Sequence, residues 1–188
     1  VIRCDPSLSA RLLRLVNSLG MGAGRNVNSF SQAILILGRQ QLRRWLNLML
    51  FAARQGDPRS PMLLARVAVR SRTLELLAKA KGLDKSTQEQ AFMAGMFSLL
   101  GVLFGMSLDE VLAPLPINEA LRAALLARGG DIGAMLAIVE LAEQGNLAAC
   151  RSALAAIQLT ADDFNEAALA AHLWMLEAVR ENKGQGNA

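Results

Sequence analysis

Apolar residues recur at helical spacing through most of the 188-residue chain, and no alternating run is long enough to demand a strand. Near the N-terminus, Leu8, Leu12 and Leu15 show this spacing. They follow Asp5 and Pro6, a cap acceptor and a proline suited to the first helical position. The pattern therefore predicts an all-α fold.

Glycine, proline and capping residues divide the chain into segments. Capping boxes begin at Ser86 and Ser107, Gly82 ends a helix, and Thr160 caps the last helix, where Asp163 lies in the first turn. The predicted helices span residues 6–18, 30–37, 39–54, 61–81, 86–104, 107–113, 118–128, 131–144, 147–157 and 161–182.

One predicted helix contains a segment of 18 residues without a charge, Ala91 to Leu108. That length is near the lower limit for crossing a bilayer core of about 30 Å. Glycines and serines interrupt the segment, and its flanks at Glu89 and Asp109 are acidic, whereas membrane helices favour basic flanks. We therefore expect a fully buried central helix of a bundle, and no membrane span.

The hydrophobic content of 53% is enough to form a sizeable core. We expect residues 1–182 to form a single helical domain and residues 183–188 to form a disordered tail. The chain begins with Val1 rather than Met, which favours an excised domain or a processed product. No leader-like segment opens it and the cysteines form no framework, so we expect a cytoplasmic location.

Charge is distributed unevenly along the chain. Residues 1–80 hold 13 Lys and Arg against three Asp and Glu, a net charge of +10, whereas the remainder has a net charge of −6. This asymmetry fits an anion-binding face, or attraction between two halves of one domain. The arginines are spread over several segments, which favours attraction between the halves.

Few residues are available for metal or nucleophilic chemistry. His172 is the single histidine, and Cys4 and Cys150 form no Cys-x-x-Cys motif. A zinc site of thiolates and imidazoles is therefore excluded, as is a histidine-rich hydrolase site. We expect no cofactor, a packed or half-exposed structural His172, and two inert cysteines.

Several motifs, in this order and spacing, resemble those of one family. Asp5-Pro-Ser-Leu-Ser-Ala-Arg-Leu-Leu-Arg-Leu-Val-Asn-Ser18, Ser29-Phe-Ser-Gln-Ala-Ile-Leu-Ile-Leu-Gly38 and Leu42-Arg-Arg-Trp-Leu46 resemble the first part of an HDOD domain. Ala91-Phe-Met-Ala-Gly-Met-Phe-Ser-Leu-Leu-Gly101 is similar to the central helix of the HDOD domains fused behind an EAL domain, the cyclic di-GMP phosphodiesterase fold.

HDOD domains are bacterial, all-helical output domains related to HD and HD-GYP metal phosphohydrolases. The resemblance implies a compact multi-helix bundle of the HD-domain-like type. It also implies that the first helices of the domain, and an EAL domain, precede Val1.

The resemblance gives the uncharged segment a chemical interpretation. Catalytically competent relatives carry a metal-binding His-Asp pair just before a glycine of the central helix, and Ser98 and Leu99 stand at the matching place before Gly101. A hydroxyl and an alkyl group cannot replace an imidazole and a carboxylate as ligands of a divalent cation. We therefore interpret Ser98 and Leu99 as a degenerate former metal site, and expect no metal, no catalytic residues and no enzymatic activity.

Two further groups of residues are candidate binding sites. Arg39, Arg43 and Arg44 are candidates for a partner-binding face, since Arg makes forked contacts to carboxylates; a DNA-reading helix is the alternative. Arg128 and Asp131 fit the Arg-x-x-Asp pattern of some cyclic di-GMP sites, so they are a candidate nucleotide contact. The intervening glycines also suit a simple turn capped by Asp131.

These observations predict a regulatory output domain that acts through protein contacts in cyclic di-GMP-related bacterial signalling. Its expected partner is a fused or separate signalling domain of the EAL type, and a homodimer is also open. A residual metal-dependent phosphohydrolase is one alternative. Nucleic-acid binding by the basic half is another, although the chain has no Tyr and only 4% aromatic residues for base stacking.

Overall fold

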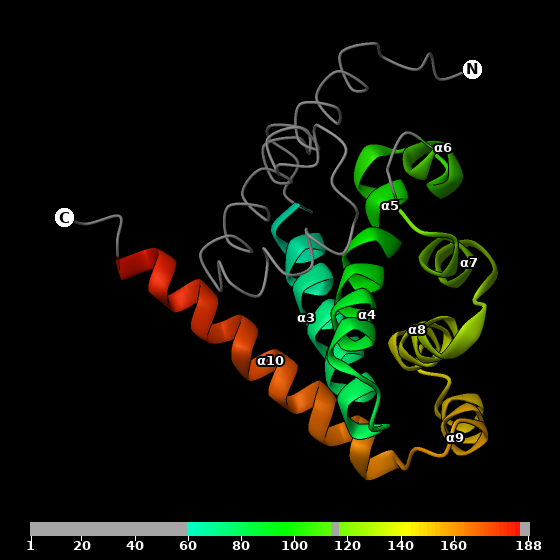
Figure 1. Ribbon diagram of the computed structural model, residues 1–188. Helices are drawn as coiled ribbons and strands as arrows, with labels where there is room; N and C mark the ends of the chain where they lie inside the picture. The colour runs from blue at the N-terminus through cyan, green and yellow to red at the C-terminus, as the bar shows by residue number, and fades with distance from the viewer. Residues whose placement is uncertain (1–59, 114–116, 185–188) are drawn as a thin grey trace. The chain divides into compact units, whose positions relative to one another are not determined.

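The computed structural model describes residues 60–113 and 117–184, and every regular element in these ranges is an α-helix (Figure 1). The all-α prediction is therefore confirmed for the described residues. The helices are α3 (Ser60–Ala80), α4 (Lys85–Ser98), α5 (Leu100–Phe104), α6 (Leu108–Leu112), α7 (Glu119–Ala127), α8 (Gly130–Glu143), α9 (Leu147–Ala156) and α10 (Ala161–Gly184).

Some predictions concern residues outside the described ranges. They include the helices predicted before residue 60, Cys4, and the partner-face candidates Arg39, Arg43 and Arg44. These remain predictions.

The contacts of the chain separate into two compact units. One unit comprises Val1–Leu64 and Leu100–Asn118, and it includes α5 and α6. The other comprises Ala65–Leu99 and Glu119–Ala188, and it contains α4, α7 to α10 and most of α3. The candidate residues Ser98, Leu99, Arg128 and Asp131 all lie in this second unit.

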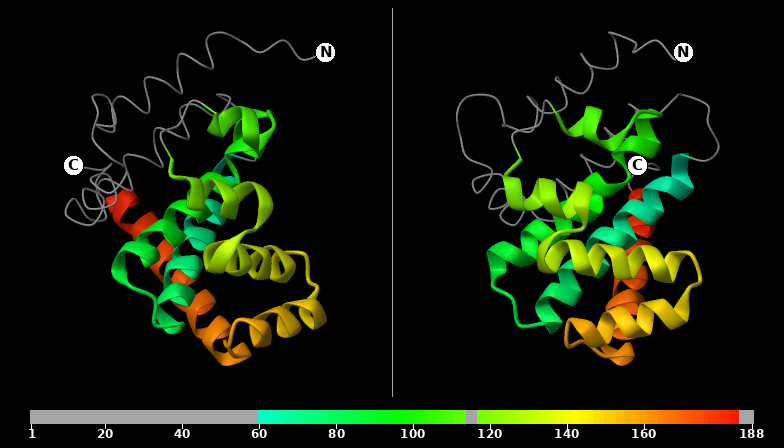
Figure 2. Two further views of the ribbon diagram at one scale, coloured as in Figure 1. Left: turned by 45° about the vertical axis from the view of Figure 1, so that its right-hand side comes forward. Right: turned by 90° about the vertical axis from the view of Figure 1, so that its right-hand side faces the viewer.

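Helix α4 forms the centre of the second unit. Its residues Ala91 to Phe97 are all buried, which explains why this stretch carries no charge. Helix α4 packs against α7 and α8, and α8 packs against α9 (Figure 2). The ring of Phe92 in α4 meets Trp174 of α10 edge to face, with centroids 6.4 Å apart, an arrangement favoured by aromatic quadrupoles.

A glycine allows α3 and α4 to approach each other closely. A Cβ atom added at Gly95 would lie 2.7 Å from the backbone nitrogen of Ser71 and 3.0 Å from its hydroxyl oxygen. The Ser71 hydroxyl donates to the carbonyl oxygen of Val67 and is thereby satisfied within α3. Only a residue without a side chain fits at this crossing.

The central helix is interrupted, so the prediction of one buried helix over 86–104 is wrong. The Leu99 N–H donates to Phe97 O, and the Ser98 hydroxyl donates to Gly95 O at 2.7 Å. A side chain thus replaces a backbone donor, which stops the regular hydrogen-bond ladder. Leu100 after the break is still buried, with 2% exposure, but Val102 in α5 is 67% exposed. None of the described helices is both long and apolar enough to cross a bilayer.

The predicted caps have mixed outcomes. The capping box of Ser107 and Glu110 is confirmed, and Thr160 accepts from the Asp163 N–H at the start of α10 as predicted. The box predicted at Ser86 is wrong, because Asp84 caps α4 by accepting from the Thr87 N–H at 3.1 Å.

Two helix termini also differ from the prediction. Asp131 does not cap α8: Gly129 holds the N-cap position without a side-chain hydrogen bond, and Asp131 lies in the first turn. Helix α10 continues to Gly184, two residues beyond the predicted end, because no helix-breaking residue comes earlier.

We predict that Gly95→Ala destabilises the protein by about 1–3 kcal/mol, because the added methyl group would displace the backbone of α3. The gain in helix propensity of up to about 1 kcal/mol offsets only part of this loss. Urea unfolding followed by circular dichroism measures the change. Gly129→Ala is the control, since its new methyl group would meet Ala123 at an ordinary 3.5 Å. Equal losses in the two variants would contradict the close crossing.

We also predict that acid weakens the start of α10. Hydrogen bonds from the Thr160 hydroxyl and N–H lower the pKa of Asp163 from its ordinary 3.8. The stabilisation is therefore present at neutral pH and is lost as pH falls through the folded-state pKa, below 3.8. Thermal melts over a pH series measure how far the melting temperature falls in acid. Asp163→Asn should reduce this fall more than the neighbouring control Asp162→Asn does. An unchanged acid slope in Asp163→Asn would contradict this role.

Candidate functional site

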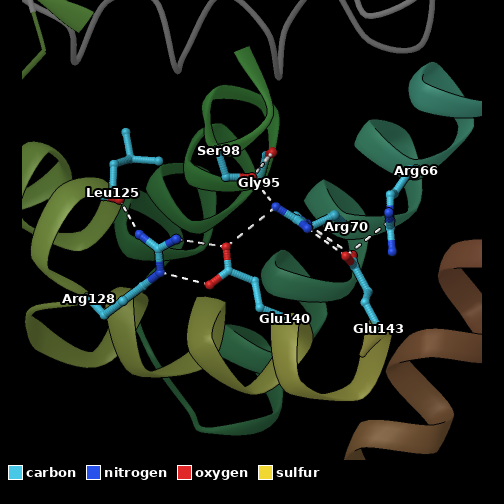
Figure 3. A network of polar contacts seen from close by, with 8 residues as sticks. All are labelled: Arg66, Arg70, Gly95, Ser98, Leu125, Arg128, Glu140 and Glu143. Carbon is cyan, nitrogen blue, oxygen red and sulfur yellow. Dashed lines mark hydrogen bonds and ion pairs between the residues drawn. The ribbon is translucent and has the colours of Figure 1, made fainter. Parts of the chain in front are cut away.

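The candidate former metal site is at the C-terminal end of α4: Ser98 is the last residue of the helix (Figure 3), and Leu99 is its C-cap. The Ser98 hydroxyl oxygen accepts a hydrogen bond from Nη1 of Arg70 at 2.8 Å while its proton is donated to Gly95 O. Leu99 is buried, with 8% exposure. The hydroxyl at the predicted ligand position is therefore hydrogen-bonded to an arginine.

Arg70, from α3, is 5% exposed and carries the central charge of this region. Its Nε and Nη2 atoms donate to the two carboxylate oxygens of Glu143 at 3.0 and 2.5 Å. Its Nη1 atom lies 3.6 Å from Oε1 of Glu140. A forked contact of this kind is among the strongest ion pairs in proteins, and it compensates for the removal of the charge from water.

The contacts continue on both sides of Arg70. Glu143 also pairs with Nε of Arg66 at 3.1 Å, and Glu140 accepts from Nε and Nη2 of Arg128 at 2.8 and 2.7 Å. The resulting polar cluster joins α3, the end of α4, the turn between α7 and α8, and α8 (Figure 3). Its members are Arg66, Arg70, Ser98, Arg128, Glu140 and Glu143.

Arg128 is held by its backbone as well as by its side chain. It adopts a φ of 55°, in the left-handed region, and its Nη1 donates to Leu125 O. Gly133 is pressed against this turn: an added Cβ there would lie 2.5 Å from the Arg128 carbonyl oxygen. The pairing with Glu140 thus holds the α7–α8 turn in a strained conformation.

Arg128 and Asp131, the candidate nucleotide contact, bind different partners. Arg128 is engaged by Glu140, whereas Oδ1 of Asp131 lies 3.4 Å from Nζ of Lys81. That Lys81 Nζ also donates to Ile157 O at 2.9 Å. A nucleotide phosphate would compete with Glu140 for the guanidinium, and the nucleotide contact stays a prediction.

A divalent metal does not fit the residues around Ser98. Protein sites for divalent cations are built mainly from carboxylates, imidazoles, thiolates and carbonyl oxygens, whereas the Ser98 hydroxyl is bound by the guanidinium of Arg70 and is followed by the alkyl side chain of Leu99. Within residues 60–113 and 117–184, no three His, Cys, Asp or Glu side chains gather as a metal-binding group.

The surroundings of His172 and Cys150 indicate structural roles for both residues. His172 is exposed, and its Nδ1 donates to Ala168 O at 2.8 Å, so the ring is not packed in the core. It lies on the outer side of α10, one turn after its acceptor. Cys150 is buried and free, and burial raises the pKa of its thiol, which disfavours the reactive thiolate.

Sequence reasoning did not single out Arg70, Glu140 or Glu143. The local sequence gives little signal for Arg70, because Ser71, Arg72 and Thr73 follow it and the stretch has a polar character. The charge asymmetry indicated the kind of partner. Arg66 and Arg70 from the basic half pair with glutamates of the acidic half, as the interpretation of mutual attraction expects.

Comparison with known proteins identifies the family. The HDOD domain family matches residues 1–137, well over half of the chain. The chain belongs to the HDOD family. The resemblance inferred from its sequence motifs is therefore confirmed at family level. No solved structure matches the chain.

Two curated proteins are similar to this chain. The chain is 29% identical over 151 residues to "Uncharacterized protein YuxH" of Bacillus subtilis (strain 168), covering 79% of this chain and 36% of that protein. It is 32% identical over 143 residues to "Cyclic di-GMP phosphodiesterase CdgJ" of Vibrio cholerae serotype O1, covering 76% of this chain and 32% of that protein. The chain spans about a third of the length of these relatives.

The family match ends inside α8. Arg70, Ser98 and Arg128 lie within the matched HDOD residues, whereas Glu140 and Glu143 follow residue 137. The carboxylates that neutralise these arginines thus follow the residues of the family match, within the stretch that the chain shares with both relatives.

We predict that Arg70→Met costs about 3–5 kcal/mol of stability, because Glu143 loses its forked partner in a largely buried position. Arg66→Met is the matched control: its side chain is 52% exposed, so a loss of about 1 kcal/mol or less is expected. Urea unfolding of both variants measures the difference. The pair Arg70→Met with Glu143→Leu should recover most of the loss, and a failure to recover would contradict direct charge compensation.

Proposed function

We propose that this HDOD chain is a non-enzymatic regulatory module that acts through protein or domain contacts in cyclic di-GMP-related signalling. The observation that carries the proposal is the hydrogen bond between Arg70 and Ser98. A cationic side chain satisfies the hydroxyl that occupies the position of a metal-binding pair in catalytically competent relatives.

The electrostatics of the polar cluster support a structural use of this position. A hydrolase of the HD type needs a metal to generate hydroxide and to polarise the phosphoester. Here Arg70 already supplies positive charge to Glu140 and Glu143, and those carboxylates are also engaged by Arg128 and Arg66. A metal would have to displace these arginines, which disfavours the alternative of a residual phosphohydrolase.

The relative from Vibrio cholerae supports the signalling context. It is named a cyclic di-GMP phosphodiesterase, and this chain matches about a third of it. We infer that the chain has the position of an output or control module beside a catalytic domain of the EAL type. Its effect requires only that two states of the neighbouring domain differ in their contact free energy with the HDOD module.

The proposal predicts two results. The purified chain should hold no stoichiometric metal in elemental analysis and should not hydrolyse cyclic di-GMP with Mn²⁺ or Mg²⁺. In the longest natural polypeptide that contains this chain, deleting residues 1–188 should change the rate of cyclic di-GMP hydrolysis by the rest.

Two opposite results would overturn the proposal. Metal-dependent turnover by the purified chain would establish an enzyme, and Glu140→Gln together with Glu143→Gln would then test whether the cluster provides the ligands. A natural polypeptide whose hydrolysis rate is indifferent to the deletion would exclude control of that reaction.

A further inference from the structure

The connection between α9 and α10 is fixed to the second unit. Nζ of Lys81, the residue after α3, donates to the Ile157 carbonyl oxygen at 2.9 Å. Gln158 then turns the chain with a φ of 62°. The Leu159 N–H donates to a carbonyl oxygen of α9, and the Leu159 side chain is 5% exposed. Helix α10 therefore starts from an anchored base, which these four residues form.

Beyond this base, α10 is held by few buried side chains. Of residues 161–177, whose burial the structure describes, only Ala167 and Ala171 are buried. They lie one turn apart on one face of the helix, and each removes only a single methyl group from water. The other apolar residues of this face are half-buried: Phe164, Ala168, Trp174 and Met175.

Helices α4 and α8 are attached much more firmly. Seven consecutive residues of α4, Ala91 to Phe97, are buried, and so are six residues of α8. The free energy of packing grows with the apolar area removed from water. An element with few buried apolar contacts opens at a lower free energy than the core does. Helix α10 should therefore open before α4 and α8.

One aromatic contact links α10 to the central helix beside it (Figure 1). Phe92 of α4 is 8% exposed, and its ring meets Trp174 edge to face. Movement of α10 away from α4 would separate the two rings and expose apolar surface on both helices. The position of α10 thus determines whether this side of α4 is covered.

We propose that α10 is a releasable arm, which swings away from α4 about its anchored base while α3, α4, α8 and α9 stay folded. In the closed state Trp174 covers Phe92, and in the open state both rings are exposed. Regulation by contact requires two states that offer different surfaces to a neighbouring domain, and the arm supplies them. This use rests on the proposed function, whereas the opening itself does not.

The opening has a measurable signature in the backbone amides. An isolated helix is marginally stable in water, so a released α10 loses most of the protection of its amides against hydrogen exchange. The amides of α4 and α8 keep their protection, because their packing does not depend on the arm.

Native-state hydrogen exchange of the complete chain, followed by mass spectrometry at increasing low urea concentrations, tests the proposal. The amides of residues 165–177 should exchange through an opening that leaves α4 and α8 protected. The Leu159 amide should stay protected together with α9, since the base remains in place.

Two neighbouring variants test how the arm is held. Trp174→Ala removes the contact with Phe92, so it should speed exchange in α10 by about tenfold or more and leave α8 unchanged. Leu173→Ala is the matched control, because Leu173 is 53% exposed on the same helix. It should exchange like the wild type. Retained protection of α8 shows that both variants are folded.

Three results would overturn the arm. The first is exchange of the α10 amides only together with those of α4 and α8. The second is equal acceleration of α8 by Trp174→Ala, and the third is an acceleration by Leu173→Ala as large as that by Trp174→Ala. None of them bears on metal content or hydrolysis, so failure of the arm and failure of the regulatory proposal are distinguishable.

Discussion

The buried guanidinium of Arg70 is the constraint on which the second unit of this HDOD chain depends. A charge removed from water is costly unless opposite charges and hydrogen-bond acceptors surround it. Arg70 obtains these from Glu143 and Glu140 of α8 and from Ser98 of α4. Helices α3, α4 and α8 must therefore keep one register relative to each other, because a shift of one turn in any of them would leave the charge without its partners.

Close backbone approach makes this pairing possible. Gly95 brings α4 against Ser71, one residue after Arg70, so the Ser98 hydroxyl comes within reach of the guanidinium. Gly133 does the same for the α7–α8 turn, which places Arg128 beside Glu140. Packing and charge are coupled in this arrangement: the glycines determine how near the helices lie, and the ion pairs determine which residues face one another.

Local patterns in the sequence were sufficient for much of the fold. Helical periodicity, Gly82 at a positive φ of 79° and the Thr160 cap are properties of neighbouring residues, so most helix bounds followed from them. The break after Ser98 did not, because it depends on a hydroxyl that binds its own helix and an arginine of another. The polar cluster was missed for the same reason, since Arg70 and Glu143 are 73 residues apart. Spacing along the chain says little about which distant charges meet.

The end of the family match inside α8 has a consequence for where the folded unit can be divided. Residues recognised as HDOD supply the positive charges, and residues after 137 supply the negative ones. The two segments are therefore coupled through the charges of Arg70 and Arg128. A fragment that ended with the family match would keep these arginines and lose the carboxylates that neutralise them. The sequence after residue 137 belongs to the same folded unit as Arg70.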